Sequence, residues 1–198
     1  MLAVLRPRNA DEARQQLQLL QRAGLCHVEL AVSLDPDWPL WVRSLVCDFP
    51  DLRLGAASVR CIAGLNAAIA ARLGYAVSPI LERSLLQGAA EAALPLVPGV
   101  FSPSEIAAAV AWGAPAVKLY PAVSLGPQYW RLLAGPLRPL PFCIAAGGLA
   151  VADVPSWLEA GVNAVALGSS LFRRGDQGLA LDPGLPSLLQ RLQQRDKP

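Results

Sequence analysis

The segment GAPAVKLYPAV, residues 113–123, is short and apolar, yet it carries a lysine, Lys118, at its centre. Other short apolar runs recur along the chain, and segments with helical periodicity separate them. Such alternation is typical of successive βα units, which form a parallel sheet covered by helices. The apolar runs predict eight strands, at residues 2–6, 27–33, 52–58, 75–78, 94–97, 116–120, 142–146 and 164–167.

The segments between the strands have the apolar spacing of helices. Asn9 or Asp11 is a candidate N-cap for the first of them, and Ser102 with Glu105 forms a capping-box pattern before a later one. Residues 175–184, which include Gly, Asp and Pro, indicate a loop. The clearest helical patterns are residues 11–23, 63–72, 103–112, 152–160 and 185–195.

Regular βα spacing within 198 residues favours one closed (β/α)8 barrel, the TIM-barrel fold, as a single domain over residues 1–198. An open, doubly wound sheet is the alternative. In a barrel, the residues of each strand alternate between the interior and the helix layer, and the C-terminal strand ends face the site. This alternation places Lys118 on one face with Ala116 and Tyr120, and Glu29 on one face with His27.

The composition excludes several classes of protein. Hydrophobic residues make up 54% of the chain and charged residues 16%, which argues against disorder. No apolar stretch reaches the roughly 20 residues needed to cross a bilayer. The opening MLAVLRPRN is unlike a signal peptide, so a cytoplasmic protein is expected. A net charge of +2 with dispersed arginines indicates no nucleic-acid surface.

The supply of metal ligands is small. The four cysteines form no CxxC pair, and without a secretion signal they are expected to be small apolar fillers. His27 is the one histidine, which leaves little material for a metal site or a Ser-His-Asp triad. The expected chemistry therefore uses no metal and no cofactor.

Lysine is rare in this chain: Lys118 and Lys197 stand against 15 arginines. Burial of a lysine disfavours its ammonium form and lowers its pKa, and a neutral, desolvated amine is a nucleophile. Lys118 is therefore a candidate nucleophile. The alternative is a lysine that extends to solvent from a strand end or pairs with an acid.

Glu29 is the one acidic residue inside a strand-like run. Near an iminium, its carboxyl group would transfer protons. The alternative is a structural ion pair with an arginine such as Arg6. A third candidate feature is a pair of glycine turns, AAGGLA at 145–150 and ALGSSLF at 166–172. These turns follow the seventh and eighth strands, where barrel enzymes commonly bind phosphate; plain tight turns are the alternative. The expected phosphate contacts are Gly147, Gly148, Gly168 and Ser169, with Ser170 as a second candidate hydroxyl.

An ordered set of segments resembles the aldolases of 2-keto-3-deoxy-6-phosphogluconate (KDPG) and 4-hydroxy-2-oxoglutarate (KHG). The set spans nearly the whole chain, and its order is more specific than any single piece. The segments are AVLR at 3–6, AGLCHVELAVS at 23–33, LGAASV at 54–59, AVSP at 76–79, LPLVPGVFSPSE at 94–105, AVKLYPA at 116–122, AAGGL at 145–149 and ALGSSLF at 166–172.

The resemblance implies a metal-independent class I aldolase that acts on a 2-keto acid, and a homotrimer. By matching position, Lys118 would form the Schiff base, Glu29 would be the general acid/base and Arg6 would contact a substrate anion. The other implied contacts are Ser58 and Pro79 at the pyruvate half, Tyr120 over the site, and Gly147, Gly148 and Ser169 at the phosphate end.

The chain also departs from the family pattern. Ser33 stands where the family usually has an arginine, four residues beyond the glutamate. Ala146 replaces the threonine of the usual TGG, and Ile80 replaces the glycine of the usual SPG. Because the first strand is expected to begin almost at Met1, the family's extra N-terminal helix is expected to be shortened. These changes bear on the substrate more than on the Schiff-base chemistry.

The leading hypothesis is reversible cleavage of a 2-keto-4-hydroxy acid. KDPG would give pyruvate and glyceraldehyde 3-phosphate, whereas 4-hydroxy-2-oxoglutarate would give pyruvate and glyoxylate. One alternative is a diverged, non-catalytic barrel that binds a phosphorylated small molecule. Another is a different phosphate-binding barrel enzyme, such as an isomerase or a thiamine-phosphate synthase.

Overall fold

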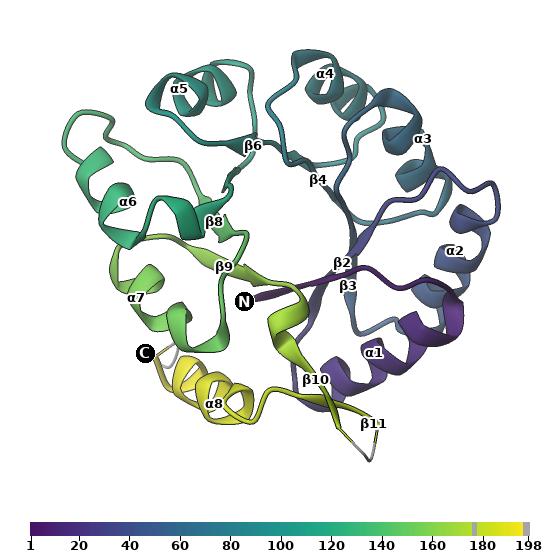
Figure 1. Ribbon diagram of the computed structural model, residues 1–198. Coiled ribbons are helices and arrows are strands. Elements are labelled where there is room, and N and C mark those ends of the chain that lie inside the picture. Colours follow the sequence, from purple (N-terminus) through teal and green to yellow (C-terminus); the bar gives the residue numbers. More distant parts are fainter. Residues whose placement is uncertain (176–177, 196–198) are drawn as a thin grey trace.

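In the computed structural model, which describes residues 1–175 and 178–195, parallel strands form a central ring and helices surround it (Figure 1). The ring strands are β1 (Leu2–Leu5), β2 (His27–Ala31), β3 (Arg53–Ala57), β4 (Ala76–Val77), β5 (Leu96–Val97), β6 (Gly99–Val100), β7 (Val117–Leu119), β8 (Cys143–Ala146) and β9 (Ala164–Leu167). The helices are α1 (Ala10–Arg22), α2 (Trp38–Asp48), α3 (Ile62–Ala70), α4 (Arg83–Glu91), α5 (Pro103–Ala111), α6 (Pro127–Leu133), α7 (Val154–Glu159) and α8 (Leu185–Arg195).

The fifth strand closes the ring because it bends at Pro98. Its first piece, β5, pairs with β4, and its second piece, β6, pairs with β7. The sheet order β5-β4-β3-β2-β1-β9-β8-β7-β6 therefore ends on two consecutive pieces of chain. The predicted (β/α)8 barrel is confirmed, and the open-sheet alternative is wrong.

Two apolar clusters separate the inside of the barrel from its outside. The larger one lies between the sheet and the helices. The smaller one fills the interior with short side chains from several strands, which are Leu2, Val77, Val97, Ala116, Ile144, Ala146, Ala164 and Ala166. Because four of these residues are alanines, longer side chains from facing strands have room to meet inside the barrel.

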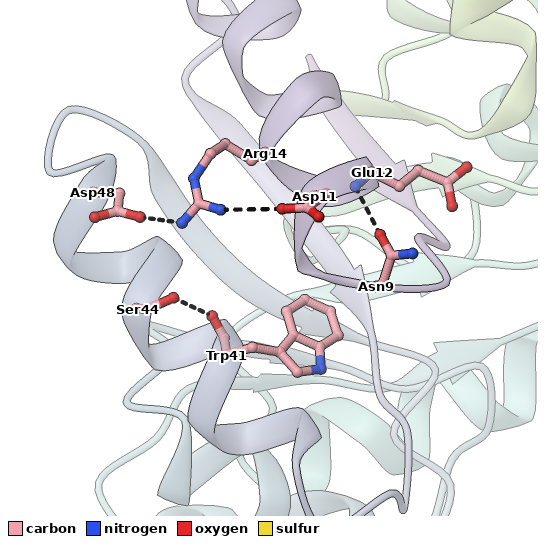
Figure 2. A network of polar contacts seen from close by, with 7 residues as sticks. All are labelled: Asn9, Asp11, Glu12, Arg14, Trp41, Ser44 and Asp48. Carbon is pink, nitrogen blue, oxygen red and sulfur yellow. Dashed lines mark hydrogen bonds and ion pairs between the residues drawn. The ribbon is translucent and has the colours of Figure 1, made fainter.

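Polar contacts fix the start of α1 and tie it to α2 (Figure 2). The Asn9 side chain accepts a hydrogen bond from the Glu12 amide at 2.9 Å. Of the two predicted candidates, Asn9 is therefore the N-cap. Arg14 then pairs with Asp11 on its own helix and with Asp48 at the end of α2. These ion pairs are exposed, so each contributes at most about 1 kcal/mol. The predicted capping box of Ser102 with Glu105 also forms, at the start of α5.

The predicted loop at residues 175–184 is wrong for its first part. β10 (Phe172–Gly175) pairs antiparallel with β11 (Gly178–Leu181), outside the barrel (Figure 1). Arg173 donates two hydrogen bonds to one oxygen of Asp182, at 3.1 and 2.8 Å, and so joins the two ends of this hairpin. Pairing between these two strands stabilises the hairpin. The Gly and Asp content of the segment indicates a loop and does not report that pairing. Residues 176 and 177 lie outside the described part of the chain.

The other predicted elements agree with the structure to within a few residues. The fifth strand was predicted to stop at Val97, but it resumes at Gly99 because the chain bends at Pro98 and does not leave the sheet. The predicted final helix is α8. Among the helices described, none is both long and apolar enough to cross a membrane.

Candidate active site

Lys118 lies in the middle of β7 and faces the barrel interior. Its neighbours Val117 and Leu119 pack in the helix layer, as strand alternation predicts. The Lys118 amide donates to the Pro98 carbonyl at 2.8 Å, and Lys118 is in register with Ile144 on β8. The residue is only 6% exposed. This burial lowers the pKa of the Lys118 amine below its ordinary value, which favours the nucleophilic neutral form.

Glu29 faces the same interior from β2. Its register partners are Val4 on β1 and Gly55 on β3. The residue is fully buried, and neither carboxylate oxygen has a hydrogen-bond partner among the described residues. Burial raises the pKa of Glu29 to about 7, although the positive charges of Lys118 and Arg6 act in the opposite direction. Glu29 can therefore exchange a proton near neutral pH.

Tyr75 packs beside Glu29 in the barrel interior. Its ring lies against Gly55, where only glycine leaves room for it. A Cβ atom on Gly55 would lie 2.4 Å from the Tyr75 ring. The Tyr75 hydroxyl has no hydrogen-bond partner in the described structure, and burial first, then the Glu29 charge, raises its pKa. No local sequence pattern predicts this contact, because it joins β3 to the residue that precedes β4.

A cavity of about 490 Å³ opens beside Lys118 at the C-terminal ends of the strands. The predicted phosphate contacts line this cavity, and so do Arg6 and Tyr120. Phe172 and Leu179, from the β10–β11 hairpin, and Gln16, from α1, line it as well. The cavity thus joins loops that are far apart in sequence, and the hairpin was not predicted as part of it.

A second cavity, of about 350 Å³, is also lined by Lys118. Lys118, Tyr120 and Arg6 line both cavities, so the two adjoin at the lysine. The remaining residues of the second cavity are Val32, Ser58, Arg60 and Pro79. Every predicted site residue therefore lines one or both cavities except Glu29, which is buried and whose charge acts on Lys118 from within the barrel interior.

Arg6 and Ser58 form a polar contact between the ends of β1 and β3. The Arg6 guanidinium donates to the Ser58 hydroxyl at 3.1 Å. Ser58 has a φ of 61°, in the left-handed region that is rare for residues other than glycine. Such strained residues concentrate at functional sites.

The first glycine turn approaches its neighbours too closely for any side chain. Gly147 and Gly148 have φ values of 95° and 78°. A Cβ atom would lie 2.8 Å from the Tyr120 ring at Gly147 and 2.5 Å from Val123 at Gly148. Only glycine fits this turn, so its backbone amides can approach a ligand closely.

In the second glycine turn, one of the two candidate serines, Ser170, has a structural role. The Ser170 hydroxyl donates to the Leu149 carbonyl at 2.7 Å and ties the two glycine turns together. Ser169 begins the short 3₁₀ helix η3 (Ser169–Leu171) and lines the larger cavity. Of the two candidate hydroxyls, the Ser169 hydroxyl is therefore the better placed for a ligand.

Residues 1–178 match the family model "KDPG and KHG aldolase". The chain belongs to this family. It is 29% identical over 178 residues to the 2-dehydro-3-deoxy-6-phosphogalactonate (KDPGal) aldolase of Escherichia coli K12, with 88% of this chain and 85% of the relative covered. The predicted family is thus confirmed, and the protein is a member of a class I aldolase family of lyases.

Solved structures of aldolases share the barrel. The native KDPGal structure superposes with a TM-score of 0.82 at 25% identity and covers 98% of this chain and 94% of its own. The KDPG aldolase of Legionella pneumophila, with pyruvate captured as a covalent carbinolamine, superposes with a TM-score of 0.74 at 24% identity. That match covers 96% of this chain and 90% of the other.

The positions that depart from the family pattern lie in different surroundings. Ala146 is buried and lines the larger cavity. Ser33 lines neither cavity, and its hydroxyl accepts a hydrogen bond from the Asp35 amide. Ile80 is 43% exposed, and its amide donates to Ser78. Of the three departures, only Ala146 therefore faces the cavity beside Lys118.

Arg60 is a cavity residue that the sequence pattern did not single out. Arg60 follows Ser58 by two positions at the end of β3. This short distance from a predicted site residue is the sequence feature that could have indicated a place in the site. Among residues 1–175 and 178–195, no group of three or more His, Cys, Asp or Glu side chains is placed to hold a metal ion.

Proposed function

We propose that this chain reversibly cleaves a 2-keto-4-hydroxy acid through a Schiff base on Lys118. The observation that carries the proposal is the placement of Lys118, which is 6% exposed, borders both cavities and shares the barrel interior with the fully buried Glu29. Burial lowers the pKa of the Lys118 amine and so favours its neutral, nucleophilic form.

In the proposed reaction, the neutral Lys118 amine attacks the C2 carbonyl and forms a carbinolamine. Protonated Glu29 donates a proton, directly or through a water, to the departing hydroxyl, and loss of water leaves an iminium. A base, ionised Glu29, then accepts the proton of the C4 hydroxyl. The C3–C4 bond breaks, its electron pair moves to the iminium, and an aldehyde departs. Protonation of the enamine at C3 and addition of water release pyruvate and the free amine.

KDPG is the proposed substrate, with pyruvate and glyceraldehyde 3-phosphate as products. The glycine turns that line the larger cavity support a phosphorylated substrate. The relative from Escherichia coli is named for the galactonate analogue, so KDPGal is an equally direct candidate. The shorter 4-hydroxy-2-oxoglutarate is the remaining candidate. Cleavage rates with the three acids, coupled to aldehyde detection, distinguish them.

The direct test is reduction with borohydride in the presence of pyruvate, followed by intact mass and peptide mapping. One pyruvyl adduct on Lys118 is expected, and Lys118→Ala should form none. Folded protein that binds phosphorylated ligands without any adduct would favour the non-catalytic barrel. Cleavage activity that persists in Lys118→Ala would indicate another class of barrel enzyme.

A homotrimer is part of the proposal, and the number three rests on the family resemblance. Large apolar side chains are exposed on consecutive loops at the C-terminal face, at Ile80, Phe101 and Val123. Exposed apolar groups of this kind mark contact surfaces. Light scattering coupled to gel filtration measures the mass of the assembly, and a monomer would contradict this part.

A further inference from the structure

The smaller cavity beside Lys118 has the chemistry of an anion site. Two guanidinium groups, those of Arg6 and Arg60, line it together with the Ser58 hydroxyl. Neither guanidinium forms an ion pair with any residue in the described part of the chain. Among the residues that the structure describes, no carboxylate lines the cavity, so its positive charge is available to a ligand.

The backbone after β3 holds Arg60 at this cavity. Ser58 takes its left-handed conformation at the strand end, and Val59 then turns into the helix-layer core, where it is fully buried. The Val59 amide donates to the Val77 carbonyl at 3.2 Å. Arg60 follows directly and reaches the cavity from a segment that is anchored on both sides, since α3 begins at Ile62.

We propose that Arg60 binds the C1 carboxylate of the 2-keto acid substrate. This inference rests on the proposed function and assigns the specificity of the same site. In any 2-keto acid the carboxylate is bonded to the carbon that Lys118 attacks, so it must lie within a few ångströms of the amine. A planar guanidinium matches a carboxylate with two parallel hydrogen bonds.

The two cavities differ in a way that orients the substrate. The larger cavity has one guanidinium, from Arg6, and the glycine turns. The smaller cavity adds Arg60 and is bounded by Val32 and Pro79, so it suits a short anionic group. The C1 carboxylate therefore occupies the smaller cavity, and the longer hydroxylated end with its phosphate occupies the larger one. Ser33, which lines neither cavity, offers no competing cation.

A neutral substrate analogue tests this assignment. Pyruvate and its methyl ester present the same carbonyl to Lys118, but the ester lacks the carboxylate charge. The measured quantity is the concentration of each that gives half-maximal adduct on Lys118 under borohydride. Arg60→Gln should raise this concentration for pyruvate roughly 10- to 100-fold, the cost of one lost charge-assisted contact. For the ester, Arg60→Gln should change the concentration that gives half-maximal adduct by less than about twofold, because the ester makes no such contact.

Two further variants serve as controls. Arg60→Lys keeps the charge and should recover part of the pyruvate affinity. Arg53→Gln removes an exposed arginine at the opposite end of β3 and should behave as the unchanged protein.

Three outcomes would overturn the assignment of Arg60. One is unchanged pyruvate affinity in Arg60→Gln. Another is an equal loss for pyruvate and ester, which indicates a structural role. The third is a loss confined to condensation with the phosphorylated aldehyde, which would place Arg60 at the distal anion. In each case the adduct on Lys118 would still support the proposed function. Absence of any adduct in the unchanged protein would instead overturn both proposals.

Discussion

The carboxyl group of Glu29 on β2 and the amine of Lys118 on β7 act on each other across the interior of the barrel. Burial lowers the pKa of Lys118, and the Glu29 charge raises it. Burial raises the pKa of Glu29, and the Lys118 charge lowers it. Each charged group therefore stabilises the other in a region where neither is well solvated, and their titrations are linked.

Glu29→Gln should lower the pKa of Lys118 further, because the variant removes the charge that raises it. Lysine labelled with ¹³C reports this directly, since the chain has only Lys118 and Lys197. The Lys118 signal should titrate at lower pH in the variant. Catalytic turnover should fall roughly 10²- to 10⁴-fold, the usual contribution of a general acid/base. An unchanged Lys118 titration would contradict the interaction.

The pH dependence of stability should carry the signature of Glu29. Its pKa is about 7 in the folded chain, against an ordinary value of 4.5. The folded state therefore holds an extra proton between these values, so this stabilisation is complete below pH 4.5 and is lost as the pH rises through 7. The loss amounts to roughly 3 kcal/mol. Urea unfolding of the unchanged protein, relative to Glu29→Gln, should show this decline. If the free energies of unfolding of the two proteins change in parallel with pH, the raised pKa of Glu29 is refuted.

Tyr75→Phe should stabilise the protein. The Tyr75 hydroxyl is buried without a partner in the described structure, so its removal relieves a desolvation cost of about 1 kcal/mol or more. Tyr129→Phe is the matched control, because the Tyr129 hydroxyl donates to the Phe101 carbonyl at 2.8 Å and its loss should destabilise. Chemical denaturation measures both changes. Destabilisation by Tyr75→Phe would reveal a hydrogen bond to an ordered water.

Gly148→Ala should cost more stability than Gly161→Ala. Both glycines have positive φ values, 78° and 97°, so alanine is strained by roughly 1 kcal/mol at either position. At Gly161 a Cβ atom meets nothing within 4 Å, whereas at Gly148 it would lie 2.5 Å from Val123. Urea unfolding separates the clash from the strain. Equal costs would show that Val123 moves aside freely.

Gly148→Ala should also raise the KM for the phosphorylated aldehyde in the condensation direction, if the glycine turn binds phosphate. The KM for unphosphorylated glyceraldehyde is the control, and it should change less. A matching increase for both aldehydes would place the phosphate elsewhere.

The sequence predicted the parts of the site that depend on local periodicity. Strand alternation alone directs Lys118 and Glu29 to the same side of their strands, and closure of the barrel then brings the two together. The glycine turns were also predictable, because their place after the seventh and eighth strands is a property of the fold.

Other parts of the site depend on contacts between segments that no local pattern reports. Arg60 reaches its cavity because Ser58 adopts a left-handed conformation, which is uncommon for serine. The Tyr75 ring lies over Gly55 on the neighbouring strand. The hairpin that supplies Phe172 and Leu179 pairs two segments whose glycines and charges indicate a loop when read alone.

The interruption of the fifth strand at Pro98 leaves few paired residues between the strands beside Lys118. Two registered residue pairs join β4 to β5 and two join β6 to β7, whereas five join β2 to β3. Pro98 itself has no amide to contribute. Amide hydrogens of β6 and β7 should therefore exchange with solvent before those of β2, which pairs with β1 over four residues and with β3 over five, so the lysine lies on a side of the ring that opens early.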